Sequence, residues 1–158
     1  MNFGTKQTKM TNIPFQNIDI KTLIPQRPPF VLIDKLLFAD LTKAISSWKI
    51  EPTSLFVDNN ILSPSAVLEN IAQTAAAHLG YINIYSNENQ EVKIGLVGAA
   101  SNLEIYDAIY VNDILTTEVQ ILEQIADLKL ISAKVTRNND LLATAEMKIA
   151  LTNISVTL

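Results

Sequence analysis

The clearest periodic pattern in the chain predicts one long helix that begins near Ser63. Serine caps a first helical turn and proline suits the position after it, so Ser63 and Pro64 are typical of a helix start. Apolar residues then recur at helical spacing and form one stripe: Leu68, Ile71, Ala72, Ala75, Leu79 and Ile82. We expect Gly80 to weaken the end of this helix and residues 86–90 to form a polar turn.

Alternating apolar and polar residues predict strands on both sides of the helix. Two short strands are expected at 30–37 and 44–51, and residues 54–62 are expected to form a loop. Four longer strands should follow the helix, at 92–106, 109–122, 127–135 and 141–151. The last of these alternates most cleanly, and its inward face should consist of Leu141, Ala143, Ala145, Met147, Ile149 and Leu151.

Glycine and asparagine predict where these strands bend or end. Gly95 and Gly98 are expected at bulges or close contacts, and residues 137–140 at a tight turn. One long apolar helix and an antiparallel sheet define an α+β domain, in which a curved sheet wrapped around the helix is the simplest way to bury it. We therefore predict a flexible arm over residues 1–17 and a single domain over residues 18–158.

Composition narrows the possible functions. The formal charge of −4 makes the chain a poor binder of phosphate backbones, so we expect no nucleic-acid partner. The absence of cysteine and the single histidine exclude cysteine and multi-histidine metal sites, and we expect neither a metal nor a cofactor. No apolar run approaches the ~18 residues of a membrane span. The N-terminal segment lacks the apolar core of a signal peptide, so we expect a cytoplasmic location.

Four segments resemble, in order, the motifs of the FabZ-type 3-hydroxyacyl-[acyl-carrier-protein] dehydratases. Residues 24–35 (IPQRPPFVLIDK) resemble the opening motif LPHRxPFLLVDR, and residues 68–73 (LENIAQ) resemble the helix motif, an acidic residue followed by ALAQ. Residues 95–103 and 111–115 resemble the AGIxxxxF strand and the VxPGDxL turn. Residues 73–77 (QTAAA) are closer to a divergent branch that accompanies aryl-polyene and flexirubin-type pigment synthesis.

The resemblance implies a fold, a substrate class and an assembly. The family has the hot-dog fold, a long helix wrapped by an antiparallel sheet, and its members dimerise edge to edge with acyl-thioester sites at the interface. The implied substrate is therefore an acyl thioester on acyl carrier protein or coenzyme A. The implied assembly is a homodimer, a heterodimer with a dehydratase homologue, or a higher oligomer.

Three departures from the family pattern concern the catalytic loop and its surroundings. Active members carry a GHFPG loop before the helix, and its histidine works with the helix glutamate of the other subunit. The corresponding residues 56–62 are fewer and contain no histidine, so the nearest counterparts are Asn59 and Asp58. Gln26 replaces the histidine of the opening motif, and residues 111–112 (VN) replace the proline-glycine pair of the turn.

Glu69 and Asn59 are the candidate catalytic residues. Glu69 and Gln73 lie one helical turn apart on the same face, so Gln73 could position the carboxylate or contact the substrate. The alternative is that both belong to a polar sector that includes Asn70 and Thr74. The alternative for Asp58 and Asn59, which their residue types favour, is that they are turn residues.

Further substrate-binding candidates are Gly98, Arg27 and Phe56. Gly98 could offer a backbone N–H to the thioester carbonyl, or could be a simple bulge. Arg27 could contact a phosphopantetheine phosphate, or could belong to a structural loop. Phe56 begins the stretch that replaces the catalytic loop. His78 is half a turn out of phase with Glu69, and we expect it to be a partly exposed helix residue.

Three functions are compatible with these residues. The first is a dehydratase-family protein that handles 3-hydroxyacyl thioesters on acyl carrier protein, is impaired alone, and pairs with a homologue that supplies the missing histidine. The second is a thioesterase that uses Glu69 with Gln73 and Gly98. The third is a non-catalytic acyl-binding subunit. Docking of an acidic carrier would need a basic patch, for which the candidates are Lys21, Arg27, Lys35 and Lys43.

Overall fold

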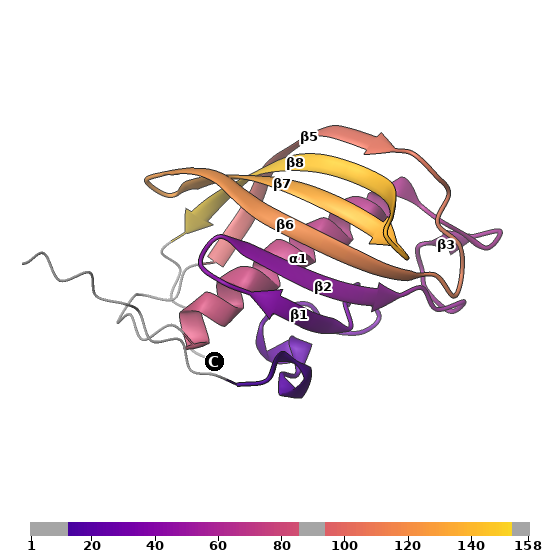
Figure 1. Cartoon of the computed structure of the whole chain (residues 1–158), viewed down its shortest axis with the longest axis horizontal. Helices are drawn as coiled ribbons and strands as arrows, with labels where there is room; N and C mark the ends of the chain where they lie inside the picture. Colours follow the sequence, from indigo (N-terminus) through magenta and orange to yellow (C-terminus); the bar gives the residue numbers. More distant parts are fainter. Residues whose placement is uncertain (1–12, 86–93, 153–158) are drawn as a thin grey trace, which may run out of the picture.

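A computed structural model describes residues 13–85 and 94–152 of the chain (Figure 1). These residues form a six-stranded antiparallel sheet that curves around one long helix, with a two-stranded hairpin beside it. The predicted α+β arrangement of a helix wrapped by an antiparallel sheet is confirmed. Residues 1–12 of the predicted arm and the predicted turn at 86–90 lie outside the described residues.

The sheet has the strand order β1-β2-β6-β7-β8-β5, and all neighbouring strands are antiparallel. Its strands β5 to β8 follow the helix in the sequence, as predicted, and β5 and β1 lie at the two edges. The elements in chain order are η1 Phe15–Asn17, η2 Ile20–Thr22, β1 Lys35–Ala39, β2 Lys43–Lys49, β3 Val57–Asp58, β4 Ile61–Leu62, α1 Pro64–Tyr85, β5 Ile94–Ile105, β6 Ile114–Ile125, β7 Leu128–Arg137 and β8 Asp140–Thr152.

The helix α1 starts at Pro64, where the sequence predicts it, and runs on past Gly80 to Tyr85. The expected weak end at Gly80 is therefore wrong. Glycine is needed there for a different reason, because the carbonyl group of Leu23 lies against the helix backbone at this point and leaves no room for a side chain. The ring of Phe15 packs on the same part of the helix, 5.3 Å from the ring of Tyr81.

Two predictions for the residues before the helix, one strand and one loop, need correction. The strand predicted at 30–37 begins only at Lys35, because residues 30–32 hydrogen-bond to side chains of α1 instead of a neighbouring strand. The loop predicted at 54–62 contains the hairpin of β3 and β4, whose pairs are Val57 with Leu62 and Asp58 with Ile61. Asn59 and Asn60 form its turn in the left-handed conformation that asparagine tolerates.

The inward face predicted for the last strand is correct except at its start. Leu141 is 43% exposed, whereas Leu142 is fully buried. The register between β7 and β8 shifts by one residue at this point, between Val135 and Thr136, and the shift moves Leu142 to the core side. From Ala143 onward the predicted alternation holds.

The contact between Gly80 and Leu23 can be tested by adding one methyl group. Alanine usually stabilises a helix interior relative to glycine by about 1 kcal/mol. At position 80 the methyl would collide with the Leu23 carbonyl, so we expect Gly80→Ala to lower the free energy of unfolding by about 1–3 kcal/mol. Urea denaturation measures this, with Ile84→Ala at a half-exposed position of the same helix as the control. A more stable Gly80→Ala protein would contradict the contact.

Candidate functional site

Glu69 lies in the second turn of α1 with its side chain half-buried. Its Oε1 accepts a hydrogen bond of 2.8 Å from Nε2 of Gln73, one turn further along the helix. The hydrogen bond between Glu69 and Gln73 is the contact that their four-residue spacing predicts. This hydrogen bond fixes the carboxylate at Oε1.

Gln73 is itself fixed by the main chain of residues 30–32. Its Nε2 also donates to the carbonyl of Phe30 at 2.8 Å, and its Oε1 accepts from the N–H of Leu32 at 2.8 Å. The side chain is fully buried, so each of these groups would be costly to leave without a partner. Gln73 therefore positions Glu69 relative to the segment that follows the proline-rich loop.

A buried polar cluster continues this arrangement across the helix. Nδ2 of Asn70 donates to the carbonyl of Leu32 at 2.7 Å, and Oδ1 of Asn70 accepts from Thr117 on β6 at 2.6 Å. The hydroxyl of Thr74 donates to the carbonyl of Asn70 and lies 2.7 Å from the hydroxyl of Ser46 on β2. The polar sector considered as the alternative for Glu69 and Gln73 thus exists, but it is buried and joins the helix to the sheet.

The hairpin of β3 and β4 contains Asp58 and Asn59, the residues that the sequence comparison with the family motifs sets against the histidine loop. Asn59 is exposed at its tip with φ 49°, so the turn role is present, and nothing in the described residues tests a catalytic one. The hairpin is attached to the segment before β6, because Leu62 N–H donates to Ile109 O at 2.8 Å and Val111 N–H donates to Asn60 O at 3.0 Å. Phe56 packs half-buried against the core at its base.

Arg137 braces the segment that holds this hairpin, a role that the sequence did not reveal. Its Nη1 donates to Asp113 at 2.7 Å and its Nη2 donates to Asp107 at 3.0 Å. The hydrogen bond to Asp113 is the main reason that the pKa of Arg137 lies above its usual value. The Asp113 carboxylate also accepts from Tyr110 N–H at 2.8 Å. In the sequence, the only indication of this cluster is Asp113, the aspartate of the turn motif at residues 111–115.

For Gly98 and Arg27 the sequence allows either a structural or a substrate-binding role, and the structure shows the structural one. Gly98 is the bulge residue of β5, because the register with β8 shifts between Val97 and Ala99. Arg27 is exposed, and its Nη1 donates to the carbonyls of Ile24 and Gln26 at 2.9 and 2.7 Å. Both positions have a structural role in the fold, and their substrate roles stay predictions.

His78 is buried rather than partly exposed, so that expectation is wrong. Its side chain is 5% exposed, and its Nε2 lies 2.6 Å from the main-chain oxygen of Asp40, 38 residues earlier in the chain. Burial lowers the pKa of His78, the positive charge of Lys129 lowers it further, and the hydrogen bond to Asp40 opposes both effects. The ring is therefore neutral at pH 7.

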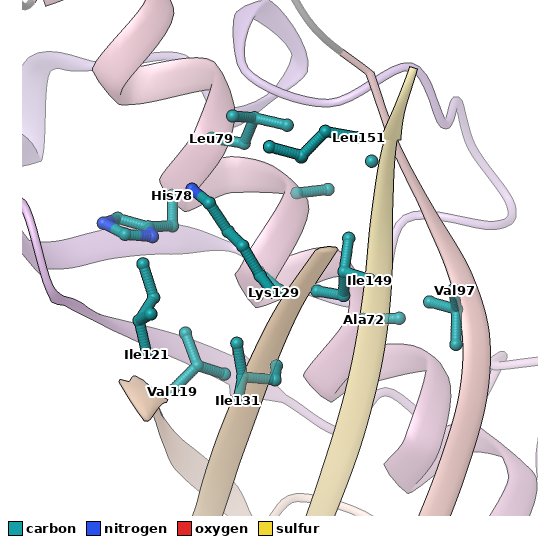
Figure 2. A pocket seen from close by; sticks show the side chains of 13 residues that line it. Ala72, His78, Leu79, Val97, Val119, Ile121, Lys129, Ile131, Ile149 and Leu151 are labelled. Carbon is teal, nitrogen blue, oxygen red and sulfur yellow. The ribbon is translucent and has the colours of Figure 1, made fainter. Parts of the chain in front are cut away.

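A small cavity of about 40 Å³ lies between the C-terminal half of α1 and the sheet (Figure 2). Figure 2 shows His78 of α1 and Lys129 of β7 beside aliphatic side chains from β5, β6, β7 and β8. The helix contributes mainly small or aliphatic residues: Ala72, Ala75, Ala76 and Leu79. The residues that line the cavity are therefore small or aliphatic, apart from His78 and Lys129.

In residues 13–85 and 94–152, acidic and histidine side chains do not gather in groups of three that could hold a metal ion. None of the helices in these segments combines the length and hydrophobicity that crossing a membrane requires.

A long helix wrapped by an antiparallel sheet of this order defines the hot-dog class, and solved structures agree. The dehydratase heterocomplex ApeI:P from Xenorhabdus doucetiae superposes with a TM-score of 0.77 at 14% identity, covering 86% of this chain and 92% of that one. A hypothetical thioesterase from Streptococcus pneumoniae, solved with coenzyme A, gives 0.61 at 11% identity, covering 74% and 84%.

The family follows from the sequence comparison. Residues 18–156 match the ApeP-like family, described as ApeP dehydratase, and the chain belongs to this family. Its curated relatives include 3-hydroxyacyl-[acyl-carrier-protein] dehydratases FabZ. The Clostridium kluyveri protein is 27% identical over 106 residues, 66% of this chain and 74% of that protein. The Staphylococcus aureus protein is 23% identical over 141 residues, 89% and 97% of the two chains. The resemblance to a divergent FabZ-like branch is confirmed.

The role of Gln73 as a structural link predicts a large stability effect. In Gln73→Ala the N–H of Leu32 and the carbonyl of Phe30 lose their partner, so we expect the free energy of unfolding to fall by about 2–4 kcal/mol. Glu69→Gln, which retains a side-chain oxygen as an acceptor for Gln73, should cost less than about 1 kcal/mol. Urea denaturation of both variants makes the comparison, and equal losses would contradict this division of roles.

The lowered pKa of His78 predicts a dependence of stability on pH. The unfolded chain binds a proton at His78 below pH 6.5, whereas the folded chain resists protonation, so stability is lost as pH falls from 6.5 through the folded pKa. We expect the urea midpoint to fall between about pH 7.5 and 5.5, and to fall less in His78→Gln, which keeps a donor for Asp40. The carboxyl of Asp40 also has a lowered pKa, but it titrates below pH 3.8. Equal decreases in both proteins would refute the assignment to His78.

Proposed function

We propose that this chain is one subunit of a dehydratase that acts on 3-hydroxyacyl thioesters carried by acyl carrier protein, and that it is impaired alone. The observation that carries the proposal is the Glu69 carboxylate, held by Gln73 in the helix motif of the family, without a histidine in the neighbouring hairpin. In this proposal a homologous subunit supplies the histidine. The resemblance of residues 73–77 to the pigment branch favours polyene-type chains as substrates.

Removal of water needs two proton-transfer groups. A base takes the proton at C2, the C3–O bond breaks, and an acid gives a proton to the departing hydroxyl, which leaves as water. Backbone donors must hold the thioester oxygen while negative charge develops there, and the N–H of Gly98 is our candidate. Glu69 provides one proton-transfer group, and this chain needs a second from its partner.

The chain's own histidine is poorly placed for this role. His78 lies nine residues beyond Glu69 and half a turn away on the helix, with Nε2 engaged by the Asp40 carbonyl. The hairpin side chains nearest to the lost histidine in sequence, Asp58 and Asn59, are exposed at a tight turn. Asn59 could hydrogen-bond to a substrate, but an amide cannot transfer a proton as histidine does.

The exposed edge of the sheet supports a paired assembly. β5 has a neighbour only on its β8 side among the described strands, and it exposes Leu96, Val97 and Ile105 by 54, 48 and 41%. An open apolar edge strand invites pairing with another strand. The structural neighbour from Xenorhabdus is a dehydratase heterocomplex, which favours a homologous dehydratase over a second copy as the partner.

A composite site can be tested in a complex with a FabZ-type subunit that retains its histidine. If Glu69 completes that subunit's site, Glu69→Gln in this chain should lower dehydration by about 100-fold or more. Formation of the enoyl thioester is followed by its absorbance. Glu51→Gln, at an exposed position whose carboxylate pairs with Lys49, is the matched control and should leave the rate unchanged.

Two outcomes would oppose parts of the proposal. Full activity of the complex with Glu69→Gln would exclude the composite site. Brisk turnover by this chain alone, lost in Glu69→Gln, would exclude its dependence on a partner. The same protein is assayed for thiol release from acyl-CoA esters, because release that depends on Glu69 would favour the thioesterase alternative. Binding of thioesters without either reaction would favour a non-catalytic acyl-binding subunit.

A further inference from the structure

Asn70 is a polar residue in the buried centre of the domain, at a position where the helix motif of the family has alanine. Its hydrogen bonds lead through Leu32 and Gln73 to Glu69. We propose that Asn70 and Thr117 are positioning residues, which hold Glu69 in the orientation that proton transfer requires. This inference rests on the proposed function, because it assumes that Glu69 transfers a proton.

The main chain of Leu32 is held on both sides by amide side chains of α1. Its N–H donates to Oε1 of Gln73 at 2.8 Å, and its carbonyl accepts from Nδ2 of Asn70 at 2.7 Å. A main-chain N–H can only donate and a carbonyl can only accept, so Leu32 determines which end of each amide faces it. Nε2 of Gln73 is therefore the donor that Glu69 receives, at 2.8 Å.

Thr117 fixes the orientation of the Asn70 amide from the sheet. Its hydroxyl donates to Oδ1 of Asn70 at 2.6 Å, and both residues are at most 1% exposed. Because both groups are buried, a hydrogen bond that is lost between them is costly to leave unreplaced. Thr117 itself lies in β6, where it pairs with Ser46 of β2 on one side and Val135 of β7 on the other. The series of hydrogen bonds therefore starts from a strand that is held by both neighbours.

A site that is shared between subunits makes this orientation important. In the proposed function the second proton-transfer group comes from the partner, so Glu69 must already be oriented when the two subunits meet. A misplacement of about 1 Å can lower the rate of a reaction about 100-fold. An interaction that acts only on the reacting geometry affects kcat rather than substrate binding. Loss of the bond between Thr117 and Asn70 should therefore lower kcat and leave KM nearly unchanged.

Removal of one hydroxyl group tests the inference in the complex with a FabZ-type subunit that retains its histidine. Thr117→Val keeps a branched side chain but loses the donor, and we expect it to lower kcat at least about fivefold with KM within about twofold. Thr117→Ser keeps the hydroxyl and should retain most of the wild-type kcat. Ser46→Ala is the matched control, because it removes a buried hydroxyl bond between the sheet and Thr74 of the same helix, and it should leave kcat unchanged.

A second readout follows the side chains themselves. In protein labelled with ¹³C and ¹⁵N, Thr117→Val should shift the side-chain amide resonances of Gln73 and the carboxyl resonance of Glu69, whereas Thr117→Ser and Ser46→Ala should leave them near their wild-type positions. An unchanged kcat or unchanged resonances in Thr117→Val, or an equal loss of kcat in Ser46→Ala, would overturn the positioning role and leave the proposed function standing. If Glu69→Gln leaves the turnover of the complex unchanged, the proposed function fails and this inference fails with it.

Discussion

The hydrogen bonds of the Gln73 side chain are the constraint on which the candidate site depends. One buried amide contacts the Glu69 carboxylate, the carbonyl of Phe30 and the N–H of Leu32. It therefore fixes the helix, the acidic side chain and the segment after the proline-rich loop relative to one another. Asn70 repeats the link at Leu32 and extends it to β6 through Thr117, so the orientation of Glu69 depends on the same buried network that joins helix to sheet.

Sequence reasoning succeeded where the determining interactions are local. Ser63 and Pro64 mark the helix start within two residues, and the contact of Glu69 with Gln73 follows from their spacing. It failed where a partner comes from far along the chain. The burial of His78 depends on a carbonyl 38 residues away, and the missing strand at 30–34 depends on amides about 40 residues later. No local pattern encodes such contacts.

The helix α1 carries different polar side chains toward its two ends. Near its start, a carboxylate is held at one oxygen in a half-buried position beside the opening motif. Nearer its end, a neutral imidazole lies beside an aliphatic cavity. Alanines separate the two, and a family of dehydratases shares the scaffold.

The turn at Asn59 and Asn60 limits what a single substitution in this loop could add to the chain. Both residues have left-handed backbones, the flanking residues pair directly, and the turn is bonded to the segment around Tyr110. Both ends of this two-residue turn are held by hydrogen bonds. A histidine at either position would therefore lie at the tip of the hairpin, and the loop would be too short to bring its ring toward the helix. If this chain depends on a partner's histidine as proposed, catalysis by the chain alone would require an insertion that lengthens this loop, and a single substitution would not supply it.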